Sequence, residues 1–101
     1  MSIKSQLTAS RDFLMAGMRA AGRGTPNTQA EQLVRACLDL VEHLVRQSES
    51  VTVAEVETTL GVFHTAAGEL EQDESASAVL AALRNAIGRL QSLRTEITQA
   101  K

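Results

Sequence analysis

Apolar residues in the second half of the chain recur at alternating steps of three and four, in two series. They are Val53, Val56, Leu60, Phe63, Ala67 and Leu70 in the first series, and Leu80, Leu83, Ile87, Leu90 and Ile97 in the second. Since an α-helix has 3.6 residues per turn, this spacing places each series on one face of a helix. Arg94 occupies the one step without an apolar residue, and residues 73–75 separate the two series. The pattern predicts an antiparallel helical hairpin.

Two further helices are predicted in the first half. The first, from about Ser2 to Ala21, has an apolar face that Ser10 and Arg11 interrupt. That face consists of Ile3, Leu7, Leu14 and Met18, widened by Phe13, Met15 and Ala21. Residues 22–27 contain two glycines and the only proline, which end helices.

The second helix is predicted to begin at Thr28 and to end before residues 47–50. It carries two adjacent apolar stripes, Leu33-Cys37-Leu40-Leu44 and Val34-Leu38-Val41-Val45. A helix with such a wide apolar surface contacts at least two neighbours, so we expect it to be the central helix.

Helix starts carry recognisable capping signals. Thr28 with Glu31, and Thr52 with Glu55, have the spacing of capping boxes, in which each side chain bonds a free amide of the first turn. These elements together predict one all-α domain over residues 1–101, a small up-and-down bundle of four helices with a C-terminal antiparallel helical hairpin.

Charge is segregated along the chain, although the net charge is only −2. Residues 1–27 and 75–101 each carry four bases and one acid, residues 28–50 carry two bases and four acids, and residues 51–74 carry six acids and no base. Because opposite charges attract, we expect the acidic third helix to lie between the basic first and fourth helices.

The residues that could carry out catalysis are few and scattered. His43 and His64 fall on different helices, and Cys37, the only cysteine, lies on a core stripe. Metal sites and nucleophilic sites need convergent ligands or an activating base, so the sequence predicts no enzyme, no metal and no cofactor. A single cysteine and the lack of an apolar span near 20 residues predict a soluble cytoplasmic protein without a membrane partner.

Residues 51–71 resemble a helix-turn-helix, because Leu60-Gly61-Val62 has the form of its turn. The resemblance implies a DNA-binding transcriptional regulator with a recognition helix over residues 64–71. That helix would contain Glu69 and Glu71 and no lysine or arginine, whereas contacts with DNA phosphates need positive charge. DNA binding is therefore the alternative hypothesis.

The face of the third helix opposite its apolar stripe consists of small residues: Ala54, Thr58, Gly61, Thr65 and Gly68. The fourth helix has a similar face, with Ala81, Asn85, Gly88, Ser92 and Thr95. Solvent faces are normally rich in long charged residues, and a glycine inside a helix costs ~1 kcal/mol relative to alanine. Close approach of another helix would explain these residues. The acids Glu55, Glu57, Glu69 and Glu71 would border the strip and could pair with a basic partner.

A second candidate surface consists of Phe13, Met15 and Met18, because methionine side chains adapt to partners. With no catalytic motif and two candidate surfaces, the sequence predicts a small protein-interaction module of the regulator, adaptor or inhibitor type. Its partner would be another protein or a second copy of the same chain.

Overall fold

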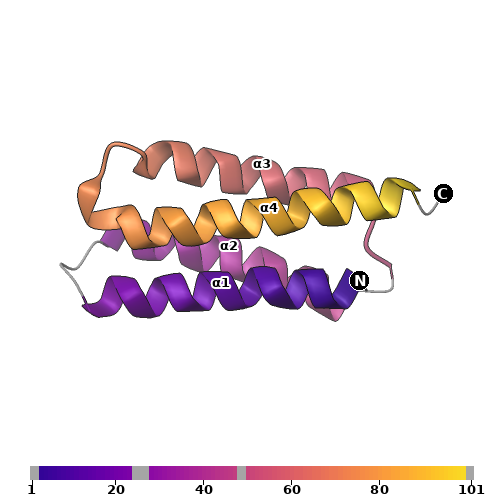
Figure 1. Ribbon diagram of the computed structural model, residues 1–101, viewed down its shortest axis with the longest axis horizontal. Helices are drawn as coiled ribbons and strands as arrows, with labels where there is room; N and C mark the ends of the chain where they lie inside the picture. The colour runs from indigo at the N-terminus through magenta and orange to yellow at the C-terminus, as the bar shows by residue number, and fades with distance from the viewer. Residues whose placement is uncertain (1–2, 24–27, 48–49, 100–101) are drawn as a thin grey trace.

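The computed structural model describes residues 3–23, 28–47 and 50–99. Within them the chain forms four α-helices and no strand (Figure 1). The helices are α1 (Ile3–Arg23), α2 (Thr28–Arg46), α3 (Val53–Leu70) and α4 (Ser77–Gln99), and a short 3₁₀ helix, η1 (Glu74–Ala76), precedes α4. All four predicted helices are confirmed, with ends within about two residues of the predicted positions.

The helices form an elongated bundle of 45 × 20 × 17 Å, in which successive helices run in opposite directions (Figure 1). Each helix packs beside two others, in the order α1, α2, α3, α4 around the bundle. The predicted all-α bundle and its C-terminal hairpin are confirmed. The four interfaces differ: α1 packs most extensively on α4, whereas α2 and α3 share the smallest interface.

The prediction that the second helix is central is wrong, because α4 takes that place. α4 packs on both α1 and α3 and also touches α2. Beside the predicted stripe, α4 has a second line of buried positions that the periodicity did not indicate, and two of its four members are alanines. Its members are Val79, Ala82, Ala86 and Leu93. Leu93 fills the core where the predicted stripe reached Arg94, and Arg94 is exposed.

The predicted arrangement of charges is also wrong. The acidic α3 packs on α4 and α2, and the two basic helices α1 and α4 pack on each other. Most charged side chains are exposed or half-buried, so buried apolar surface decides which helices meet. An exposed ion pair at 3.7 Å joins Arg84 of α4 to Glu71, the residue that follows α3.

Small and polar residues let α1 approach α4 closely, and the sequence pattern missed them. Gln6, Ser10 and Gly17 are all buried. The Ser10 hydroxyl donates to the Gln6 carbonyl at 3.0 Å, so its burial leaves no hydroxyl donor unpaired. A Cβ at Gly17 would lie 2.5 Å from the Cβ of Ala82, so glycine is required for this helix separation.

The start of α3 has the predicted capping box. Thr52 has extended backbone angles, its hydroxyl accepts the Glu55 amide at 3.2 Å, and the Glu55 carboxylate accepts the Thr52 amide at 3.2 Å. The corresponding box at Thr28 involves a side chain outside the described part, although α2 does begin at that residue.

Replacing Thr52 with alanine removes the hydroxyl that accepts from the Glu55 amide and donates to the Glu55 carboxylate, whereas the bond from the Thr52 amide to that carboxylate can remain. We expect a loss of about 0.5–2 kcal/mol in the free energy of unfolding, measured by urea denaturation. Thr95→Ala is the matched control, since Thr95 is exposed inside α4 and its hydroxyl donates to the Gln91 carbonyl of its own helix. Equal stability of the two variants would show that the cap contributes nothing.

Candidate protein-binding groove between α2 and α3

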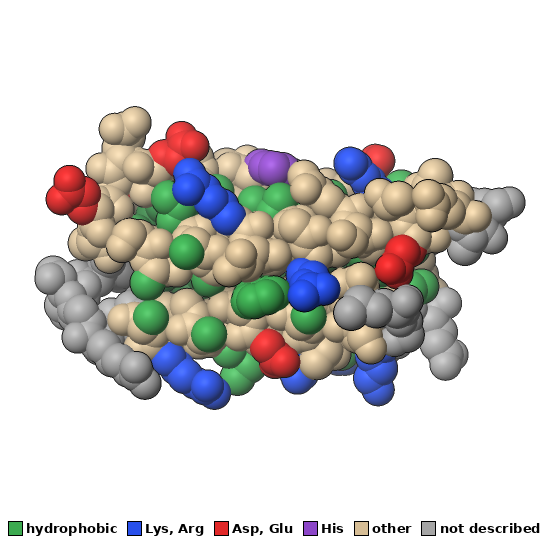
Figure 2. Space-filling view, viewed as in Figure 1, with side chains coloured by type: hydrophobic (Ala, Val, Ile, Leu, Met, Phe, Trp, Pro, Cys, Tyr) green, Lys and Arg blue, Asp and Glu red, His purple; other side chains and the backbone are tan. Residues whose placement is uncertain are grey.

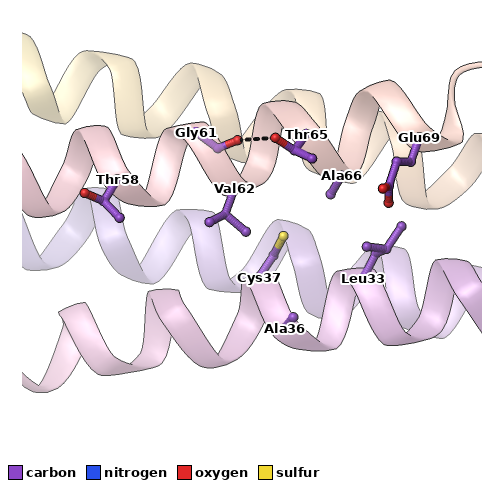
Figure 3. Close-up of a pocket in the computed structure, with 9 residues that line it drawn as sticks. All are labelled: Leu33, Ala36, Cys37, Thr58, Gly61, Val62, Thr65, Ala66 and Glu69. Atoms are coloured by element: carbon purple, nitrogen blue, oxygen red, sulfur yellow. Dashed lines mark hydrogen bonds between the residues drawn. The ribbon is translucent and has the colours of Figure 1, made fainter.

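The weak contact between α2 and α3 leaves an open groove along their junction. Its larger stretch has a volume of about 510 Å³ and is lined almost entirely by apolar and small side chains (Figure 3). The lining residues are Leu33, Ala36 and Cys37 from α2, and Thr58, Gly61, Val62, Thr65, Ala66 and Glu69 from α3. In Figure 3, Leu33 and Cys37 point up toward α3, and Val62 points down toward α2.

A second stretch of about 270 Å³ adjoins the first, because Thr58 lines both. It is lined by Leu40, His43 and Leu44 from α2, and by Ala54, Glu55, Thr58 and Thr59 from α3. The two stretches together follow most of the length of α3. We refer to them jointly as the α2–α3 groove.

The groove exists because small residues face it from both helices. Ala36 and Gly61 are exposed, and a Cβ at Gly61 would meet nothing within 4 Å apart from its own helix and chain neighbours. Val62, which lies beside Gly61, is 39% exposed and is the one large hydrophobic residue that counts as exposed in the described part of the chain. The groove therefore presents apolar surface to solvent.

The threonines of the groove add little polarity, because their hydroxyls are already bonded within α3. The Thr58 hydroxyl donates to the Ala54 carbonyl at 3.0 Å, and the Thr65 hydroxyl donates to the Gly61 carbonyl at 3.0 Å (Figure 3). A threonine bonded in this way offers its methyl group to a neighbour. The lining is thus more apolar than its composition indicates.

Cys37 forms part of the floor and is fully buried. Burial raises the pKa of its thiol to about 11, because desolvation disfavours the charged thiolate. The thiol is therefore protonated at neutral pH and acts as a small apolar side chain rather than a nucleophile.

Both charged side chains that line the groove are carboxylates. Glu69 is exposed, its carboxylate makes no hydrogen bond or ion pair with any described residue, and its side chain extends from α3 toward Leu33 of α2 (Figure 3). Glu55 lines the other end, where its carboxylate also completes the cap of α3. No lysine or arginine is among the described residues that line either stretch.

Only part of the small-residue strip predicted on α3 lines the groove. All five members are exposed, and Ala54, Thr58, Gly61 and Thr65 line the groove, whereas Gly68 does not. Of the four acids predicted to border the strip, two line the groove and two do not. Glu55 and Glu69 line the groove, and Glu57 and Glu71 lie outside it, with Glu71 paired to Arg84 of α4.

The α2 side of the groove was missed by reasoning from sequence. Leu33 and Leu40 belong to a stripe that predicts full burial, yet both are only half-buried, and Ala36 beside them is exposed. The only sequence signal for this side of the groove was the wide apolar surface of α2, which we interpreted as evidence that the second helix is central.

The second predicted surface is largely used within the bundle. Phe13, Met15 and Met18 are each half-buried on α1, and none of them lines the α2–α3 groove. Met18 packs against the core, and the Arg89 guanidinium of α4 lies over the Phe13 ring, 5.9 Å from its centre. On this face of the bundle, apolar side chains are separated by polar and charged ones (Figure 2).

The turn required by the helix-turn-helix interpretation is not formed. α3 continues without interruption from Val53 to Leu70, through Leu60, Gly61 and Val62. A recognition helix needs a separate axis to enter the major groove, so this part of the DNA-binding hypothesis is wrong.

Neither a metal site nor a membrane span is found among the described residues. They contain no group of three or more His, Cys, Asp or Glu side chains placed to hold a metal ion. None of their helices combines the length and hydropathy of a membrane span. Comparison with protein families, with curated proteins and with solved structures finds no match to this chain.

Proposed function

We propose that the protein is a non-enzymatic interaction module that binds an α-helix of a partner protein in its α2–α3 groove. A regulator, an adaptor or an inhibitor would act in this way. The observation that supports the proposal best is the open apolar groove between two helices, with Val62 exposed beside Gly61. Because the exposed groove lining is apolar, covering it with a partner would be favourable.

A helix is the occupant that suits the shape of this groove. The groove lies between two side-by-side helices, where an amphipathic helix can add its apolar face as a further member of the bundle. Glu55 and Glu69, which mark its two ends, are 14 residues apart on α3. At 1.5 Å per residue this separation is ~21 Å, about four turns of a bound helix.

The absence of side-chain volume at Gly61 and Ala36 favours a partner with one large apolar residue at the middle of its stripe. Such a side chain would enter the space that neither residue fills. A leucine or methionine on the partner helix would have the size and shape for this contact.

A cytoplasmic location is part of the proposal. Its support is the single unpaired thiol of Cys37, which is buried in the core. Thiols remain reduced in the cytoplasm. One alternative is a homodimer, which would use the same groove. The other alternative, DNA binding, was based on a turn at residues 60–62, where α3 is continuous.

Filling the groove should weaken binding without unfolding the bundle. Gly61→Leu places a side chain into open space inside the groove, and Gly68→Leu makes the same change just outside it. A neutral amphipathic peptide of leucine, alanine and glutamine, about four turns long, serves as the probe. We expect Gly61→Leu to weaken its binding at least about tenfold, and Gly68→Leu to leave it unchanged.

Amide chemical shifts in an NMR titration are the measurement, and thermal unfolding of both variants is the control for folding. Perturbed amides in α2 and α3 that disappear in Gly61→Leu alone would support the proposal. A peptide that perturbs neither helix, or that binds both variants equally, would contradict it. Sedimentation equilibrium of the unmodified chain distinguishes a second copy from a separate partner.

A further inference from the structure

The charges of the α2–α3 groove restrict the kind of helix that can bind there. Glu55 and Glu69 line it, and the described residues of α3 include three glutamates but no lysine or arginine. From α2 the lining contributes His43 and otherwise only apolar or small residues. An approaching helix therefore meets a negative field around an apolar floor.

No lysine or arginine among the described residues lines the groove, and two arginines of the neighbouring helices are already paired. Arg84 of α4 pairs with Glu71 at 3.7 Å, and Glu71 follows the last residue of α3 and lies outside the groove. Arg46 of α2 pairs with Glu42 at 4.0 Å, and Arg46 is also outside the lining. Glu69 has no ion-pair partner among the described residues, so its carboxylate is available to a partner.

We infer that the occupant is a basic amphipathic helix from a different protein; this inference rests on the proposed function. Its apolar stripe covers Val62 and the space at Gly61, and a lysine or arginine at one end pairs with Glu69. Glu55 attracts a second basic residue at the other end. Since these two glutamates are 14 residues apart, the basic residues of the partner are about 14 positions apart along one face.

A second copy of the chain fits this surface less well. Two copies meeting groove to groove would bring two α3 helices together, each with glutamates and no base among its described residues. Like charges that face each other oppose association and suppress the wrong partner. The acidic groove therefore favours a foreign basic helix over self-association.

Three peptides of equal length test the inference. The first has a leucine stripe with two lysines about 14 positions apart, the second has glutamates in place of those lysines, and the third has the composition of the first in an order that breaks the stripe. We expect the lysine peptide to bind about fivefold or more tightly than the glutamate peptide, because exposed ion pairs are individually weak. This difference should shrink when salt is raised from about 50 mM to about 500 mM.

Two variants test whether the preference for the lysine peptide comes from a carboxylate inside the groove. Glu69→Gln removes the unpaired carboxylate inside the groove, and Glu57→Gln removes an exposed carboxylate of the same helix outside it. We expect the preference for the lysine peptide to fall about twofold or more in Glu69→Gln and to persist in Glu57→Gln. Equal effects of the two variants would overturn the assignment to the groove.

The outcomes separate the inference from the proposed function. Equal binding of the lysine and glutamate peptides, with no binding of the scrambled peptide, would overturn the basic partner and keep the groove. Equal binding of the lysine and scrambled peptides would show attraction by charge alone and overturn the inference. Failure of all three, with failure of the neutral peptide, would overturn both. Self-association that Gly61→Leu removes would identify a second copy and overturn the foreign partner.

Discussion

Phe63→Ala should lower the free energy of unfolding by about 3–5 kcal/mol, a large part of the ~5–15 kcal/mol typical of a domain. Phe63 is the largest of the fully buried side chains, and it lies at the centre of the buried face of α3. Its removal would leave a cavity that the surrounding helices cannot fill without moving. Chemical denaturation at equilibrium measures the loss.

Val62→Ala is the matched control for this prediction, since it truncates the neighbouring residue of the same helix. Val62 is 39% exposed and faces the groove, so its truncation should change stability by no more than about 0.5 kcal/mol. A loss at Val62 as large as the loss at Phe63 would mean that the two faces of α3 are assigned incorrectly.

Gly17→Leu is expected to have the next largest effect, a loss of about 1–3 kcal/mol or more, because the new side chain cannot fit between α1 and α4. A Cβ alone would lie 2.5 Å from the Cβ of Ala82, and that atom is attached directly to the backbone of α4. A contact of this kind is relieved only by moving one helix away from the other, which would separate the most extensive interface of the bundle.

Two controls distinguish this clash from a general effect of helix propensity. Gly88→Ala changes a glycine of α4 that faces open space, and it should stabilise the protein by up to about 1 kcal/mol. The double variant Gly17→Ala with Ala82→Gly exchanges the two side chains across the contact and should be more stable than Gly17→Ala alone. Equal stability of the single and double variants would contradict the close-contact explanation.

The sequence was sufficient to predict the four helices, because each has an apolar series of helical spacing bounded by caps, turns or helix-breaking residues. It was not sufficient to predict which helices pack together. Periodicity identifies a buried face but not the neighbour that covers it. The small residues Gly17 and Ala82 set the α1–α4 contact, and small residues give little hydrophobic signal in a periodic pattern.

The candidate site was predicted from one side only. The small residues of α3 are visible in the sequence because glycine and threonine are unusual on an exposed helix face. Their counterpart on α2 was not visible, since Leu33 and Leu40 have the pattern of core residues. Only the three-dimensional separation of α2 from α3 shows that these leucines are partly exposed.

The unequal interfaces of this bundle have a consequence for how the protein could change over evolution. The closest contact lies between α1 and α4, while the groove lies between α2 and α3, so the residues that hold the helices together and those that would choose a partner form largely separate sets. Substitutions at exposed positions such as Ala36 or Thr65 should cost little stability. Mutation could then alter binding preference repeatedly while the scaffold stays above its folding threshold.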